Sequence, residues 1–154
     1  IFLFSCGEEV IQISKPCTVE PTFGGKDITI RFTTNVIIDN KISIDHRGFI
    51  YGENIIMIDS NFSRVAKIGG FICGDHNFEV NVQYTDTIET CGLKLSGTMN
   101  SNYLSGIVSF CPNAQNCNFV QIGSISGSYT EHVVIGSVFT PLYSGEFTAS
   151  LVDQ

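Results

Sequence analysis

Alternation of apolar and polar residues is the feature of this chain that most restricts its fold. Residues 77–85 contain Phe78, Val80, Val82 and Tyr84, with a polar residue between each pair. Residues 27–33 and 145–152 alternate in the same way. A period of two places successive side chains on opposite faces of a β-strand, so each stretch predicts a half-buried strand.

The rest of the chain also favours strands over helices. Alanine, the best helix former, occurs only at positions 66, 114 and 149. Residues 35–45 predict a hairpin that turns at Asp39 and Asn40. Only residues 60–68 are compatible with a helical turn, with Ser60 as its N-cap. The remaining predicted strands are residues 9–13, 54–58, 66–73, 90–95, 104–110, 118–125 and 132–139.

This spacing of strands predicts a single all-β domain over residues 1–154. We expect a disulfide-stapled antiparallel β-sandwich, immunoglobulin-like or jelly-roll in plan, with a β-barrel as the second choice. An apolar-Ser-Gly pattern recurs in the second half, at residues 95–97, 104–106 and 125–127. Three short matches do not make a solenoid, and we interpret them as the strands and turns of a meander.

The number and spacing of the cysteines favour disulfides over metal or redox sites. The cysteines are Cys6, Cys17, Cys73, Cys91, Cys111 and Cys117. Their number is even, and they lack the CxxC pairs of zinc and thioredoxin-like sites. Local closure predicts the pairs Cys6–Cys17, Cys73–Cys91 and Cys111–Cys117. Disulfides persist in oxidising compartments, so we expect an extracellular, secreted chain after removal of a signal peptide. Asn61, in Asn61-Phe62-Ser63, is the candidate N-glycosylation site.

Charge excludes two classes of partner. The net charge is −7, and the basic residues are scattered singly. An acidic chain repels the phosphates of nucleic acids, and attraction to anionic lipids is disfavoured for the same reason. No apolar run approaches the ~20 residues of a membrane-spanning helix. We therefore expect no nucleic-acid partner and no membrane span.

The residues that commonly perform catalysis do not form a recognisable motif. His46, His76 and His132 occur outside HExxH and HxH patterns, and GxSxG is absent. The adjacent acids Glu8 and Glu9 are expected to be solvated charges. The Asp-x-Asn triplets at residues 59–61 and 75–77 are more typical of turns than of calcium sites. We predict no catalytic residue, no metal and no cofactor, and hence not an enzyme.

The first four residues, Ile1, Phe2, Leu3 and Phe4, are all apolar. Free chain ends are usually polar, so residues 1–5 are expected to pair as a strand, within their own sheet or with a neighbouring copy. The second possibility predicts a structural subunit of an extracellular filament, coat or surface layer that assembles with copies of itself by strand addition. The alternative is a secreted domain that binds a small ligand or a glycan, with Phe and Tyr side chains lining a pocket.

Overall fold

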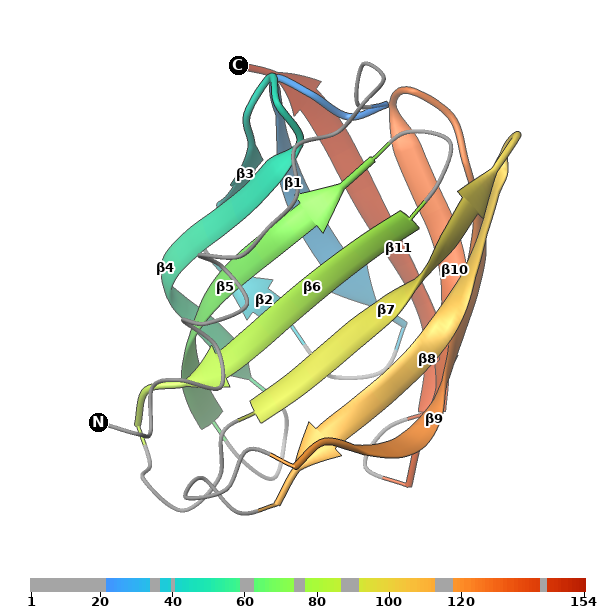
Figure 1. Cartoon of the computed structure of the whole chain (residues 1–154). Helices are drawn as coiled ribbons and strands as arrows, with labels where there is room; N and C mark the ends of the chain where they lie inside the picture. The colour runs from blue at the N-terminus through green and yellow to red at the C-terminus, as the bar shows by residue number, and fades with distance from the viewer. Residues whose placement is uncertain are drawn as a thin grey trace.

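The structure is a computed structural model that describes residues 22–33, 37–39, 41–58, 63–73, 77–86, 92–112, 118–141 and 144–154, with side chains undescribed at 37–39 and 57–58. These residues form eleven strands and no helix (Figure 1). The strands are β1 (Lys26–Phe32), β2 (Ile37–Asp39), β3 (Ile42–Ile44), β4 (Phe49–Ile58), β5 (Ser63–Ile72), β6 (Asn77–Tyr84), β7 (Gly92–Asn100), β8 (Tyr103–Cys111), β9 (Val120–Tyr129), β10 (Val133–Phe139) and β11 (Ser144–Asp153).

The strands close into a ten-strand antiparallel barrel. From β4 to β11 each strand pairs with the next one in sequence, and β1 then pairs with β11 over its whole length, from Lys26 opposite Asp153 to Phe32 opposite Phe147. The all-β, antiparallel prediction is confirmed, and the barrel is the correct one of the two plans. The sandwich was wrong because the pairing of the first and last strands joins what would have been two sheets.

The predicted hairpin at residues 35–45 is also wrong. β2 and β3 do not pair with each other; both lie between β1 and β4 and are antiparallel to both. β2 and β3 follow one another along a single strand position of the wall. The eleven strands therefore fill the ten strand positions of the barrel. Asp39 and Lys41 therefore flank an interruption within a strand rather than a reversal of the chain.

The repeated Ser-Gly pattern lies where β7, β8 and β9 run side by side. Gly97 pairs with Gly106, as expected for a meander. A Cβ on Gly97 would lie 2.0 Å from the carbonyl oxygen of Ser105, and one on Gly106 would lie 2.2 Å from that of Ser96. Such close backbone approach is typical of the bends of a barrel wall and accounts for glycine at both positions.

The inward face of the wall carries a single apolar core. Alternate residues of every strand whose side chains the structure describes enter this core, including Ile44, Ile55 and Met99, which are almost completely buried. Residues 63–68 belong to β5, so the predicted helical turn at 60–68 is wrong for that part, and residues 60–62 lie outside the described residues. Ala66 and Ile68 are core residues of that strand, which shows that tertiary burial outweighed the local helical pattern.

Candidate ligand-binding end of the barrel

The two ends of the barrel differ in how well the core is covered. The upper end carries the turns at residues 22–25, 45–48, 101–102 and 130–132 and the C-terminus. At the lower end lie the last residues of β1, β4, β6, β8 and β10 (Figure 1). Phe23 closes the upper end: it is 2% exposed, and its ring meets that of Tyr129 edge-on at 5.4 Å.

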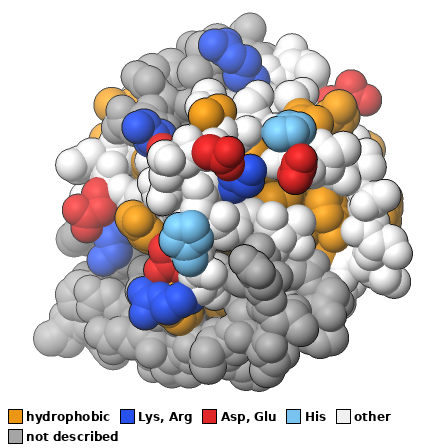
Figure 2. Space-filling view, turned by 90° about the horizontal axis from the view of Figure 1, so that it is seen from above, with side chains coloured by type: hydrophobic (Ala, Val, Ile, Leu, Met, Phe, Trp, Pro, Cys, Tyr) orange, Lys and Arg blue, Asp and Glu red, His pale blue; other side chains and the backbone are white. Residues whose placement is uncertain are grey.

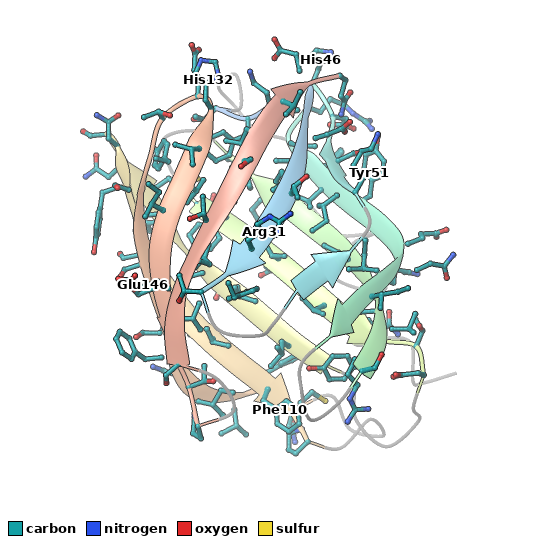
Figure 3. All side chains as sticks on the ribbon, turned by 180° about the vertical axis from the view of Figure 1, so that it is seen from behind. Arg31, His46, Tyr51, Phe110, His132 and Glu146 are labelled. Carbon is teal, nitrogen blue, oxygen red and sulfur yellow. The ribbon has the colours of Figure 1, made fainter. Side chains whose placement is uncertain are left out.

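Towards the lower end some core residues, such as Ile55 and Ala66, are fully buried, but others are only partly buried. Those that pack against the core from this end are Ile30, Phe32, Tyr84, Leu93, Leu95, Ile122 and Val138. They come from β1, β6, β7, β9 and β10, so they are contributed by about half of the strands of the barrel. Phe110, opposite Leu93 in register, lies at the same end and is also partly buried (Figure 3). The lower end thus combines an aliphatic and aromatic lining with incomplete coverage.

A small polar group stands at the rim of this end. The guanidinium of Arg64, at the start of β5, lies 5.1 Å from the ring centroid of Tyr84 and 3.7 Å from a carboxylate oxygen of Asp86. Burial raises the pKa of Tyr84 above its usual value, against the opposing charge of Arg64, and Asp86 raises it further. The phenol is therefore a neutral hydroxyl at physiological pH, available as a donor and an acceptor.

The upper end carries an ordered turn rather than a pocket lining. A carboxylate oxygen of Asp45 accepts hydrogen bonds from the backbone N–H groups of Arg47 and Phe49, at 2.8 and 3.1 Å. Burial alone would raise the pKa of Asp45, but these bonds and the Arg47 guanidinium, 2.9 Å away, hold it below its usual value. Figure 2 views this end from above and shows acidic, basic and histidine side chains mixed over it.

The described histidines occupy separate upper-end turns. His46 follows β3, and its ring lies against Gly25, where an added Cβ would come within 2.6 Å of it (Figure 3). His132 precedes β10 and pairs with Glu131 at 3.3 Å. His76 lies outside the described residues. Within the described ranges, no three His, Cys, Asp or Glu residues are grouped to hold a metal ion. No described helix is long and apolar enough to cross a membrane.

The cysteines correct the pairing predicted from local closure. Of the six, only Cys73 and Cys111 are described, and they are not bonded to each other. Cys111 is a thiol, completely buried at the end of β8, so the predicted Cys111–Cys117 bridge is absent. Cys73 is disulfide-bonded, and its partner therefore lies outside the described residues.

The predicted Cys73–Cys91 bridge stays a prediction, because Cys91 lies outside the described residues.

Several other predicted sites cannot be placed. Asn61, the pair Glu8 and Glu9, and the apolar residues 1–4 lie outside the described residues, as do Cys6 and Cys17. Sequence reasoning also missed the rim group of Arg64, Tyr84 and Asp86. The alternation in residues 77–85 places Tyr84 on the inward face, but only the pairing of β5 with β6 brings Arg64 beside it.

Comparisons of the chain with protein-family models, with curated proteins and with solved structures found no match. Arguments about function therefore depend on the geometry of the barrel itself.

Proposed function

We propose that this chain is a secreted, non-enzymatic binding domain that holds a small, mainly apolar molecule in the lower end of its barrel. The observation behind the proposal is the one-sided burial of the core. Inward-facing apolar side chains of five strands are partly exposed at the lower end, whereas Phe23 and its neighbours are buried at the upper end. Small-molecule sites are typically apolar concavities with a few polar groups, and the ends of β-barrels are common places for them.

The rim group indicates what such a ligand would look like. Leu93, Leu95 and Ile122 offer only apolar contacts, which suit a hydrocarbon body. Tyr84 and Arg64 add hydrogen-bond donors at one side, which suit a polar end group on that body. Asp86 already lies near Arg64, and the chain has a net charge of −7, so a neutral polar end such as a hydroxyl is favoured over a carboxylate.

The closed wall weakens the alternative of a filament subunit built by strand addition. That mechanism needs a strand with an unpaired edge. Among the described strands each one has a neighbour on both sides, since β1 and β11 pair with each other. Secretion is supported by the even number of cysteines and by the disulfide at Cys73.

The test is a titration of the full chain with the neutral apolar fluorophore N-phenyl-1-naphthylamine, followed by displacement with medium-chain alcohols. We expect saturable binding with one probe per chain. Native mass spectrometry should then show one alcohol bound to each chain. Fluorescence that rises without saturation, or no retained alcohol, would contradict the proposal.

Two matched variants locate the site. Leu95→Gln places an amide in the lining, and we expect it to weaken probe binding by about tenfold or more, because a buried amide without a partner is costly. Ile107→Gln makes the same change on the outer face of β8, where the side chain is 38% exposed, and should leave binding unchanged. If both variants bind alike and both remain folded by circular dichroism, the ligand does not enter the barrel.

A further inference from the structure

Three neighbouring strands of the barrel wall contain no charged residue. Between Lys94 and Glu146 the only charged residue is Glu131, in the turn before β10, although the chain has 15 acidic and 8 basic residues. The uncharged strands are β8, β9 and β10, which stand side by side at the right of Figure 1. Every other strand position of the barrel carries at least one charged residue, so the net charge of −7 belongs almost wholly to the rest of the chain.

The same three strands hold most of the exposed apolar side chains. Seven large apolar side chains are exposed within the described ranges, and five of them lie on β8, β9 or β10, namely Tyr103, Ile107, Val120, Ile135 and Phe139. An outward position does not by itself bring exposure, since Asn81, next to the core residue Val82 on β6, also points outward and is only 3% exposed. A contiguous exposed apolar patch commonly marks an interaction surface.

The outward side chains of β8, β9 and β10, called here the uncharged face, form an ordered pattern of three rows. Each outer row has a serine on β9 between two large side chains: Tyr103–Ser128–Ile135 towards the upper end and Ile107–Ser124–Phe139 towards the lower end. The row between them consists of Ser105, Ser126 and Ser137. Four large side chains therefore stand at the corners of a cross of serines.

This pattern levels a curved wall. The outside of a closed barrel is convex, so β9 stands higher than β8 and β10 on either side of it. Serines occupy the crest, and the large side chains occupy the flanks. The resulting surface is flat, which suits a flat partner better than a small molecule, since small molecules bind in concavities.

The uncharged face also has an approximate two-fold axis, which passes through Ser126 perpendicular to the sheet. A half-turn about this axis exchanges Tyr103 with Phe139, an aromatic residue for an aromatic one, and Ile107 with Ile135. The serines are exchanged with one another in the same way. As a result, a second copy that stacks face to face about a two-fold axis along β9, or across it, sets each aromatic side chain over an isoleucine of the other copy.

We propose that the uncharged face binds the same face of a second copy of this chain in a two-fold dimer. Two copies with a net charge of −7 repel each other, and this face lets them meet without burying a charge or opposing like charges. The centres of protein interfaces are likewise poor in charged residues and rich in aromatic ones. A two-fold dimer closes on itself, so it does not propagate into a filament, and the inside of the barrel stays free for a ligand.

The size of the face fits a reversible dimer. Four strand spacings from β7 to β11 give a width of about 19 Å, and the nine residues of β8 give a height of about 30 Å. Two such faces bury about 1,100 Å² in total, near the lower limit for a specific interface. Lys94 on β7 and Glu146 on β11 border the face on its two sides, as expected for the polar rim of an interface.

The first test is sedimentation equilibrium of the full-length chain and of two matched variants. The wild type should pass from 16.8 kDa to twice that mass, with a Kd of about 10–100 µM. Tyr103→Glu puts a charge into the face and should weaken the dimer about a hundredfold. Tyr51→Glu makes the same change on β4, five strand positions from β9, where the tyrosine is 52% exposed against 53% for Tyr103, and should leave the Kd unchanged.

Two results would overturn the proposal. One is a wild-type chain that stays monomeric at about 0.5 mM, well above the expected Kd. The other is a dimer that Tyr103→Glu and Tyr51→Glu affect alike, with both variants folded by circular dichroism. Ile135→Glu, on the other flank of the face, should repeat the loss seen with Tyr103→Glu, which guards against a local effect at the start of β8.

The second test asks which residues meet across the two-fold axis. An axis along β9 sets Tyr103 over Ile135 of the other copy, and an axis across β9 sets it over Ile107. Tyr103→Lys mixed with Ile135→Glu, or with Ile107→Glu, should therefore restore a dimer in one of the two mixtures, at concentrations where each variant alone is monomeric. Restoration in neither mixture would contradict face-to-face stacking.

The third test is the dependence of the dimer on salt. Raising the salt concentration screens the repulsion between two copies of net charge −7, so the Kd should fall as NaCl increases from about 20 to 200 mM. A Kd that rises with salt would mean that ion pairs hold the copies together, and would reject the uncharged face as the interface.

Discussion

The upper and lower ends of this barrel are built from the same strands but are covered differently. At the upper end Phe23 and Tyr129 close the core, and Gln154 ties the C-terminus to the wall through hydrogen bonds to the carbonyls of Lys26 and Ile44. At the lower end several core side chains, Phe32, Tyr84 and Leu93 among them, are only partly buried. This difference in packing suits the binding function proposed above, because stability and ligand access make opposite demands on packing.

The largest expected effect comes from truncating one phenylalanine side chain at each end of the barrel. Phe23→Ala removes a buried ring and should lower the free energy of unfolding by about 3–5 kcal/mol. Phe110→Ala removes a partly buried ring at the lower end and should cost about half as much. Urea unfolding of both variants checks this. Equal losses at the two ends would mean that the lower end is as well packed as the upper one.

Added volume should separate the fully buried core from the partly exposed lining in the opposite sense. Ala149, on β11, is 5% exposed, and Ala149→Leu should cost about 1–3 kcal/mol through overpacking. Leu93→Phe adds volume to the partly exposed lining and should change the free energy of unfolding by less than about 0.5 kcal/mol. The same unfolding measurement is decisive: a large cost for Leu93→Phe would indicate that the lower end has no room for a ligand.

The smallest effect concerns the ordered upper turn and depends on pH. The folded state lowers the pKa of Asp45, so its ionised form stabilises the fold at neutral pH. That contribution is present above the unfolded pKa of an aspartate and is lost as the pH falls through the lowered folded value. We expect Asp45→Asn to have a lower Tm than the wild type at pH 7 and a nearly equal Tm at pH 2.5. A difference that is constant with pH would exclude the carboxylate charge as its cause.

Local sequence patterns predicted where most strands lie, but they did not predict that the strands close into a barrel. The alternation in residues 27–33, 77–85 and 145–152 correctly predicted β1, β6 and β11, because half-buried strands display their burial directly in sequence. The same patterns do not state that β1 and β11 are neighbours, which is what distinguishes a barrel from a sandwich. The prediction of a hairpin at Asp39 and Asn40 was wrong for a related reason. Turn-forming residues also occur where a strand is interrupted, and local sequence does not distinguish the two cases.

The candidate site was less predictable than the fold. Twelve Phe and five Tyr residues suggested that aromatic side chains could line a pocket, but composition does not say which ones gather at one end. Tyr84, Phe110 and Phe32 are brought to the lower end by the up-and-down order of strands, and Arg64 joins them only through the register of β5 with β6. The predicted bridge between Cys111 and Cys117 was wrong for a related reason, because nearness in sequence does not determine which thiols are oxidised.

The sequence by itself determined that this chain folds from antiparallel strands with one apolar face, because a period of two is a local property of the backbone. Tertiary structure alone decided that the first and last strands meet, that Phe23 is buried at one end of the core while Tyr84 and Leu93 are only partly buried at the other, and that Asn81 is buried on an outward face. Those features depend on contacts between residues far apart in the chain, which no local pattern of side chains records.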